Sequence, residues 1–182
     1  MTNFIPIFPL GIVVYPGEKL HLHIFEERYK QLIRECRDTG RFFGIPAVIQ
    51  NKVCEQGMLM QLKEIVQEYE NGEMDIRTEG VRVFRVLEFI RNVPDKLYSG
   101  AIVTYPENTL DRGRPDLMSR VVKGMREMHR LLEISKDFSK PDEELLSYDV
   151  GHHAGLSLRD RERARGLRCA RSDRRRLRRT QP

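Results

Sequence analysis

Histidines are the residues of this sequence whose types and spacing come nearest to a metal site. His21 and His23 stand two residues apart, so on a strand both side chains point to one face, and His152 and His153 form a second pair. The four could hold a metal if the C-terminal segment packed against the hairpin that contains His21. No acid or cysteine stands at ligand spacing to them, so we predict half-exposed strand and helix-start residues and no bound metal.

The adjacent acids Glu26-Glu27 and Glu143-Glu144 are poorly placed for acid–base catalysis. Neighbouring residues on a helix do not face one another, whereas a general acid and base must reach the same substrate. The helix dipole favours acids in the first turn, and this explains both pairs. Serine and cysteine occur without a helper motif. We therefore predict no catalytic residue, no enzyme activity and no cofactor.

The three cysteines indicate a reducing compartment. Cys36, Cys54 and Cys169 are an odd number at wide spacing and form no CxxC pair, which is typical of neither a disulfide framework nor a zinc site. We predict that the first two are buried thiols that pack as small apolar groups. The expected location is the cytoplasm of a bacterium.

The apolar start of the chain does not have the pattern of a membrane or export signal. No Lys or Arg precedes the apolar run, its prolines at positions 6, 9 and 16 interrupt it, and no small-residue cleavage site follows. A spanning helix needs about 20 consecutive apolar residues, but charge arrives at Glu18 and Lys19. We predict that the segment belongs to the fold and that the protein has no membrane partner.

The first 105 residues predict a β-rich unit with one helix. Proline removes backbone donors at positions 6 and 9, so the segment 4–8 fits only a short or edge strand. Polar and apolar residues alternate over 19–24, which predicts a strand with one face toward solvent. Apolar residues then recur at helical spacing from Phe25 to Cys36, which predicts a helix that Gly40 ends. Further strands are predicted over 11–15, 42–49, 57–69, 74–78, 81–90 and 98–105, with turns at Pro16-Gly17 and Asn71-Gly72 and a bulge at Gly80.

The chain changes from strands to helices after Pro106. Pro115 stands at the favoured first-turn position of a helix, and apolar residues at helical spacing follow it. The methionines of this stripe could form an adaptable groove for unfolded clients, but we predict the simpler arrangement, a stripe that faces the core. Shorter helices are predicted over 142–148 and from about residue 149. The stripe comprises Leu117, Val121, Met125, Met128 and Leu132, widened by Met118, Val122 and Leu131.

Charge divides the sequence into a mildly acidic body and a basic tail. The 182 residues, 40% of them apolar, suffice for one domain with a sizeable core. The net charge is +5, but residues 159–182 contain eleven arginines and three acids, while the rest of the chain has 21 basic and 24 acidic residues. An acidic body argues against a nucleic-acid surface on the folded part, so nucleic acid is expected only through the tail.

Three interpretations of the arginine-rich tail, 159–182, stay open. It could bind nucleic acid or acidic partners through its cations. It could be a solvated, disordered end, because its few apolar residues cannot drive folding. It could also be aberrant, since residue usage changes abruptly near Leu158, as a reading-frame shift would cause. We favour the last interpretation slightly.

Two stretches of the sequence resemble a known family. "FPLGIVVYPGEKLHLHIFEERYKQLI" resembles the opening of the Lon protease N-terminal domain, the LON substrate-binding domain with its PUA-like barrel, and "RTEGVRVFRV" resembles the family's Thr-x-Gly-x-x-Arg-x-x-Ile strand pair. The resemblance covers roughly residues 3–158. It is carried by Phe8-Pro9-Leu10, Val14-Tyr15-Pro16-Gly17 and Phe25-Glu26-Glu27-Arg28-Tyr29, where Glu27 replaces the usual proline, and by Thr78, Gly80 and Arg82 or Arg85.

The resemblance implies an α+β fold, a small PUA-like bent β-barrel followed by a helical C-terminal part. The expected boundaries are 1–106 for the barrel, 107–158 for the helical part and 159–182 for the tail. The dipeptide Gly-Lys occurs nowhere, so the phosphate loop of the Lon ATPase is lacking, and the chain is too short for the Lon protease domain with its Ser–Lys dyad. A stand-alone member of the family is therefore expected.

The implied function is non-catalytic binding of unfolded or extended protein segments, for delivery to a protease or quality-control system. A hydrophobic concavity or an unpaired strand edge would hold the extended chain. Phe8, Tyr15 and Phe25, near the first hairpin, are the candidate peptide contacts. The alternative is an RNA-binding module, because the PUA-like barrel is shared with RNA-modifying proteins, but the acidic body argues against it.

Overall fold

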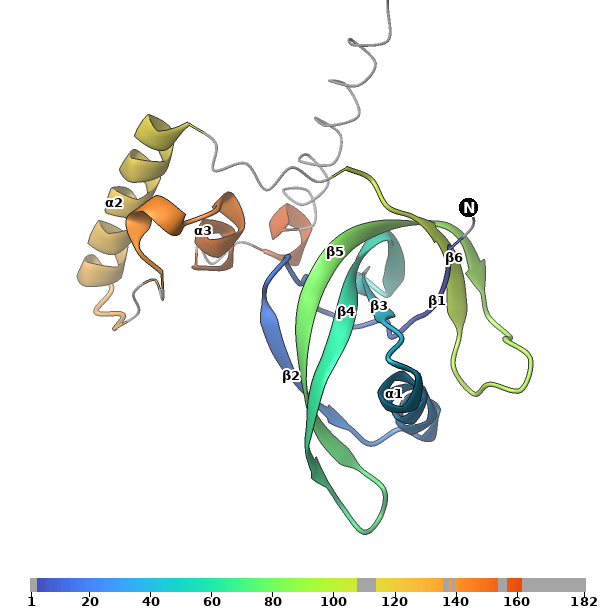
Figure 1. Cartoon of the computed structure of the whole chain (residues 1–182). Helices are drawn as coiled ribbons and strands as arrows, with labels where there is room; N and C mark the ends of the chain where they lie inside the picture. Colours follow the sequence, from blue (N-terminus) through green and yellow to red (C-terminus); the bar gives the residue numbers. More distant parts are fainter. Residues whose placement is uncertain (1–2, 108–113, 136–137, 139, 154–156, 162–182) are drawn as a thin grey trace, which may run out of the picture.

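The computed structural model describes residues 3–107, 114–135, 138, 140–153 and 157–161, and Figure 1 shows the whole chain. In these ranges six strands form one antiparallel sheet, one helix lies between its second and third strands in the chain, and the other helices follow the last strand. This confirms the predicted α+β class. The elements are β1 (Asn3–Pro6), β2 (Lys19–Ile24), α1 (Glu27–Thr39), β3 (Phe43–Ile49), β4 (Lys52–Glu68), β5 (Met74–Ile90), β6 (Gly100–Thr104), α2 (Pro115–Leu131), the 3₁₀ turn η1 (Asp142–Glu144) and α3 (Ser147–His153).

The sheet is strongly bent, with β1 at one end and β3 at the other. Its strand order is β1-β6-β5-β4-β3, and β2 pairs with the first half of β5. Single parallel bridges, Ile7 to Gly44 and Leu10 to Ala47, connect the segment after β1 to β3, so the two ends of the sheet approach one another. The curvature of β4 and β5 is visible in Figure 1. β1 lies at the end of the strand order, as its prolines predicted.

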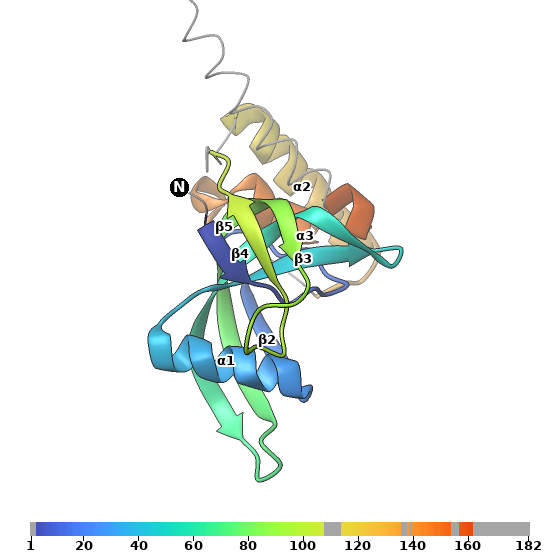
Figure 2. The ribbon, with the colours of Figure 1, turned by 90° about the vertical axis from the view of Figure 1, so that its right-hand side faces the viewer.

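Helix α1 covers the inner face of the lower part of this sheet, as Figure 2 shows. Tyr29, Leu32 and Ile33 recur at helical spacing and are buried against the apolar sides of β2 and β5. The helix ends at Gly40, whose φ of 69° is the left-handed conformation that glycine adopts without strain. Both the helix and its predicted end are therefore confirmed.

The strand predicted over 11–15 is wrong. The segment is irregular, although Val13, Val14 and Tyr15 are all buried. Val14 packs in the main core, while its two neighbours pack in a separate cluster with Ala47 and Tyr148. Because its side chains are buried on two sides, the segment needs no strand pairing to bury its apolar residues. The Tyr15 N–H donates to the Glu18 carboxylate at 2.8 Å in place of a ladder bond.

The strands of the central hairpin are longer than predicted. β4 and β5 have 17 residues each, and both continue through shifts of register where shorter strands were expected. One shift lies beside Gly80, because Met60 pairs with Gly80 whereas Leu59 pairs with Arg82. The predicted bulge at Gly80 is therefore confirmed, and Gly72, with φ of 76°, lies in the predicted tight turn.

Helix α2 begins at the predicted Pro115, but the predicted burial of its stripe is wrong for most of it. Val122 and Met125 are buried with Leu145 and Val150, which lie on the segment from η1 to α3. Within the described ranges, this is the apolar cluster that α2 joins, and apolar residues elsewhere on the helix are exposed. The exposed members are Leu117, Val121, Met128, Leu131 and Leu132.

The predicted boundaries stay predictions, because residues 108–113 and 162–182, which hold the start of the helical part and most of the tail, lie outside the described residues. The helix predicted over 142–148 is replaced by η1 and α3, and α3 ends at His153. No helix within the described ranges is long and apolar enough to cross a membrane.

Candidate functional site

Two of the three predicted peptide contacts are core residues. Phe8 is buried, and its ring stacks on Tyr29 with centroids 3.8 Å apart. Tyr15 is also buried, and its ring stacks on Tyr148 of α3 with centroids 5.1 Å apart. Phe8 therefore joins α1 to the sheet, and Tyr15 joins α3 to it. Neither side chain is open to a ligand on the surface.

Phe25 is the predicted contact that the structure exposes, with 59% of the residue accessible. It follows β2 directly, and its ring lies 6.3 Å from the imidazole of His23. Tyr69, directly after β4, approaches the same imidazole edge-on at 6.0 Å and is itself exposed. These three rings, His23, Phe25 and Tyr69, form what we call the aromatic rim.

Hydrogen bonds connect the rim to the hairpin between β4 and β5. His23 Nδ1 lies 2.8 Å from Asp75 Oδ1, and His23 Nε2 lies 3.2 Å from Glu73 Oε2. The Tyr69 hydroxyl donates to Asp75 Oδ2 at 2.7 Å. His23 and Asp75 stand directly opposite each other in the β2–β5 register, so strand pairing itself brings the two groups together.

Helix α1 holds the turn between β4 and β5 in place. The buried Lys30 ammonium donates to the Asn71 carbonyl at 3.0 Å and to the Glu27 carboxylate at 2.8 Å. The acid partner offsets the cost of burying the charge. One helix thus positions both ends of the aromatic rim, because Phe25 lies just before α1 and Tyr69 lies at the turn that α1 holds.

The acids around His23 raise its pKa above the ordinary value of 6.5, chiefly through the hydrogen bond to Asp75. Since the folded pKa is the higher one, protonated His23 stabilises the fold fully below pH 6.5, and this contribution is lost as pH rises through the folded pKa. We expect Asp75→Asn to bring the His23 pKa back toward 6.5. A titration of the imidazole by NMR measures it.

The control for this titration is Asp116→Asn on α2, which removes one acid on a different element. It should leave the His23 pKa unchanged. An Asp75→Asn variant with the wild-type His23 pKa would contradict the assignment of Asp75 as the main cause.

Strand β2 presents an unpaired edge beside the rim. One edge is hydrogen-bonded to β5 from Lys19 to Ile24, and no strand of the described residues pairs with the other edge. The side chains alternate as predicted, with Leu20 and Leu22 toward the core and His21 toward solvent. Such an edge offers a row of backbone donors and acceptors to an added strand.

A shallow hollow of about 390 Å³ lies on the solvent face of β2, β5 and β4. β2 and β5 contribute both polar and apolar residues to its wall, and β4 contributes the exposed Val66. This volume is within the range of sites for small ligands or a few side chains. The lining residues are His21, Leu22, His23, Val66, Asp75, Ile76 and Arg77.

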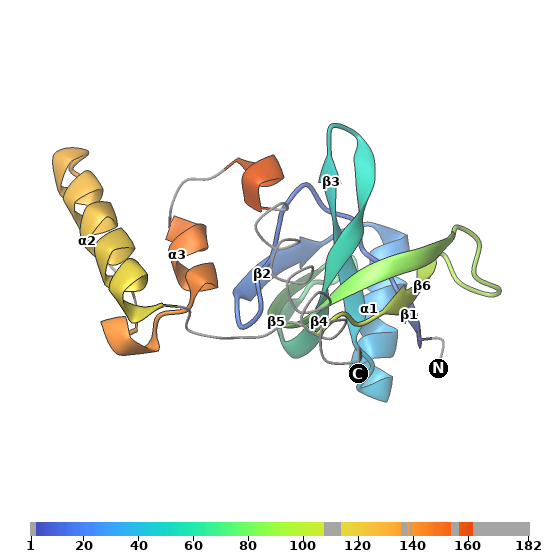
Figure 3. The same cartoon turned by 90° about the horizontal axis from the view of Figure 1, so that it is seen from above.

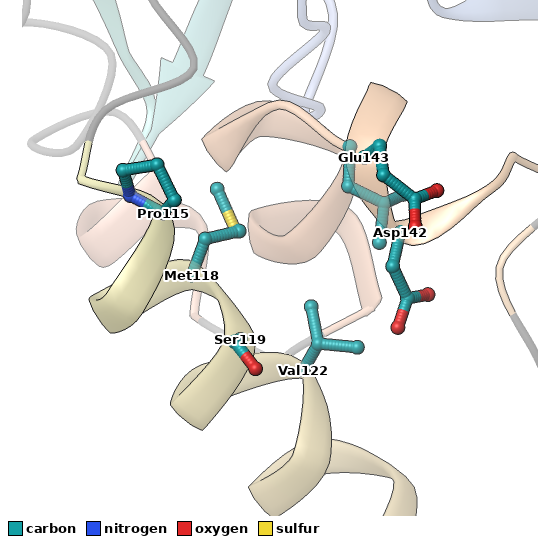
Figure 4. Close-up of a pocket in the computed structure, with 7 residues that line it drawn as sticks. Pro115, Met118, Ser119, Val122, Asp142 and Glu143 are labelled. Carbon is teal, nitrogen blue, oxygen red and sulfur yellow. The ribbon is translucent and has the colours of Figure 1, made fainter.

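A second hollow, of about 440 Å³, lies between α2 and η1 and is drawn in Figure 4. Met118 and Val122 of α2 form its apolar side, and Asp142 and Glu143 stand on the other side. The carboxylate of Asp142 accepts two hydrogen bonds from Arg126, at 2.7 and 2.8 Å. The bidentate pair fixes η1 against α2 and so sets the width of the hollow.

Among the described residues, no group of three His, Cys, Asp or Glu side chains could hold a metal ion. The side chains of His152 and His153 lie outside what the structure describes, so their pairing with His21 and His23 stays untested. Burial raises the pKa of the Cys36 thiol to about 12, which keeps the thiol protonated. Cys36 therefore packs as the predicted apolar thiol, whereas Cys54 is only partly buried.

Sequence reasoning missed Tyr69 and Val66 as neighbours of His23. They are 46 and 43 residues away from His23 in the chain, and the register of β2, β5 and β4 brings them together. The one available signal was the Asn71-Gly72 turn, which folds β4 back on β5. Pairing across that turn places the end of β4 beside the start of β5.

A bent antiparallel sheet with a helical C-terminal part defines a mixed α+β domain. The chain belongs to the ATP-dependent protease La (LON) substrate-binding domain family, whose model matches residues 5–161. The sequence resemblance is thereby confirmed. The match supports a substrate-recognition module, and it does not extend to the ATPase or protease domains of Lon.

Solved structures of Lon N-terminal domains share this fold. A Lon N-terminal domain protein from Xanthomonas campestris is 29% identical, with a TM-score of 0.57 over 69% of this chain and 75% of that one. The N-terminal domain of Mycobacterium avium complex Lon protease is 11% identical, with the same TM-score over 92% of this chain and 98% of that one. The second likeness concerns the fold alone.

Proposed function

We propose that this protein binds extended segments of other proteins at the outer edge of β2, without changing them chemically. The single observation that carries the proposal is the β2 edge that no described strand pairs with, which has the exposed Phe25 at its end. An extended chain that adds to the edge gains backbone hydrogen bonds whatever its sequence. Membership of a family of substrate-binding domains supports the same function.

The aromatic rim adds selectivity for apolar side chains. Phe25 and Tyr69 are exposed rings on either side of His23, so an apolar side chain of the bound segment can pack between them. The acids Glu73 and Asp75 beside the rim favour segments that carry a Lys or Arg next to that apolar residue. Client segments are therefore unfolded, apolar and basic, met in the cytoplasm on the way to a protease.

We expect Phe25→Ala to weaken binding of an unstructured, fluorescein-labelled peptide of alternating apolar and basic residues by about tenfold, since one buried aromatic anchor contributes about 1–2 kcal/mol. Fluorescence anisotropy measures it. Leu97→Ala is the matched control, because Leu97 is a similarly exposed apolar residue in the β5–β6 connection. Equal affinities of the two variants would contradict the role of the rim.

Strand addition itself is tested with the same peptide methylated at alternate backbone nitrogens. Methylation removes donors along one edge of the peptide without changing its side chains, so methylation on the pairing edge abolishes binding and methylation on the opposite edge does not. If both methylated peptides bind like the parent, the segment is held by side chains alone and the β2 edge is not the site.

A further inference from the structure

One face of helix α2 is apolar, and no described part of the protein covers it. The side chains of Leu117, Val121, Met128 and Leu131 lie on this face, with 39% to 67% of each residue accessible. In Figures 1 and 3, α2 is the outermost element of the molecule, and α3 lies between it and the sheet. The exposed face is distinct from the buried one, which contains Val122, Met125 and His129.

The spacing on this face is that of a helix-packing seam. Positions 117, 121, 124, 128 and 131 follow one another at intervals of four and three residues, which is the heptad repeat of two helices packed along their length. The residues at these positions therefore lie in one row along the helix, as packing against a second helix requires. We call these five positions the α2 seam.

Gly124 stands at the centre of the seam. A glycine within a helix costs about 1 kcal/mol relative to alanine. Apart from the adjacent helix backbone, no atom of the described residues lies within 4 Å of where a Cβ at Gly124 would be. No described residue therefore requires glycine at this position. A second helix that crosses α2 at position 124 would require glycine there, because a residue without a side chain lets the two helix backbones come close.

The charges beside the seam are complementary to those of a second copy of the helix. Arg120 and Glu127 stand seven residues apart on the same flank of the seam, and both are exposed. Glu127 pairs with Arg130 of its own helix, while no ion pair of Arg120 is found among the described residues. Two copies of α2 related by a two-fold axis, and running antiparallel, place Arg120 of each copy beside Glu127 of the other. In a parallel pair neither residue meets an opposite charge.

We infer that α2 docks along its seam against α2 of a second copy of this chain, in antiparallel orientation. A two-fold interface of this kind is self-complementary, so every contact between the two helices occurs twice, once from each copy. The arginine-rich tail is a poor occupant of the seam, since residues 159–182 contain two leucines and no heptad repeat. The inference does not depend on the proposed binding of peptides at β2.

Charge reversal tests this interface with the full chain in sedimentation experiments from micromolar to millimolar concentration. Wild type should dimerise. Arg120→Glu and Glu127→Arg should each weaken self-association about tenfold or more, because each variant alone places like charges opposite one another twice. An equimolar mixture of the two variants should associate again, since every Glu then faces an Arg. Lys123→Glu, elsewhere on the polar side of α2, is the control and should behave like wild type.

A wild-type protein that stays monomeric over the whole range would overturn the inference. So would single variants that associate like wild type, or a mixture that stays monomeric while wild type dimerises. Restored association in the mixture excludes a client protein as the natural occupant, because two copies of the chain then suffice. Circular dichroism of each variant verifies that α2 is folded.

Discussion

Replacing Phe84 with alanine is expected to lower the free energy of unfolding by about 3–5 kcal/mol, the usual cost of removing a fully buried phenylalanine. Phe84 lies on β5 directly opposite Gly57 of β4, and none of it is accessible to solvent. Its ring covers both Gly57 and Gly44 of β3, so three strands are joined by one side chain. Urea denaturation followed by circular dichroism measures the change.

Two further variants make this prediction specific. Phe89→Ala, on the same strand but 40% exposed, should cost at most about 1 kcal/mol. Gly57→Ala should destabilise the wild type strongly, because a Cβ at Gly57 would overlap the Phe84 ring. In the Phe84→Ala background the same change should cost at least about 1 kcal/mol less. Additive costs would show that the ring and the glycine do not share this space.

Local signals in the sequence were sufficient wherever a turn or cap depends on a few neighbouring residues. Gly40 and Gly72 are predicted as a helix end and a tight turn, and both have positive φ. Pro115 begins its helix for a similar reason, because its ring fixes φ and its missing N–H is not needed in the first turn. These outcomes depend on backbone conformation, which a single residue can decide.

Signals failed where tertiary contacts decide the outcome. The β-branched residues of the segment 11–15 favour a strand, but burial on two sides makes strand pairing unnecessary. The stripe of α2 was expected to be buried because helical spacing identifies an apolar face without saying what lies against it. The apolar arc of this helix is wide enough for two contacts, and the described chain supplies one of them.

The candidate site was only partly accessible to sequence reasoning for the same reason. Phe8, Tyr15 and Phe25 are aromatic residues near one hairpin, and nothing in their types indicates which are buried. Burial was decided by distant residues, since Tyr29 covers Phe8 and Tyr148 covers Tyr15. Phe25 remains exposed because it occupies the connection between β2 and α1, where the chain turns away from the sheet.

The second large effect is expected at Gly80, where alanine should lower the free energy of unfolding by about 2–3 kcal/mol. A Cβ at Gly80 would overlap the backbone carbonyl of Tyr15. The same Cβ would lie 3.1 Å from the Met58 side chain. The backbone at Gly80 cannot shift easily to relieve this overlap, because two hydrogen bonds hold it. The Gly80 N–H donates to the Glu18 carbonyl at 2.9 Å, and the Gly80 carbonyl accepts from the Gly17 N–H at 2.7 Å.

Gly124→Ala is the matched control, with an effect of opposite sign. Its Cβ would meet open space within an exposed helix, so alanine should stabilise the protein by about 0.5–1 kcal/mol when the measurement is made on monomer. Denaturation curves that show the two substitutions with the same sign would contradict the close approach at Gly80. Because this contact holds the Pro16-Gly17 turn against β5, Gly80→Ala should also displace β2, and peptide binding at the β2 edge should weaken with it.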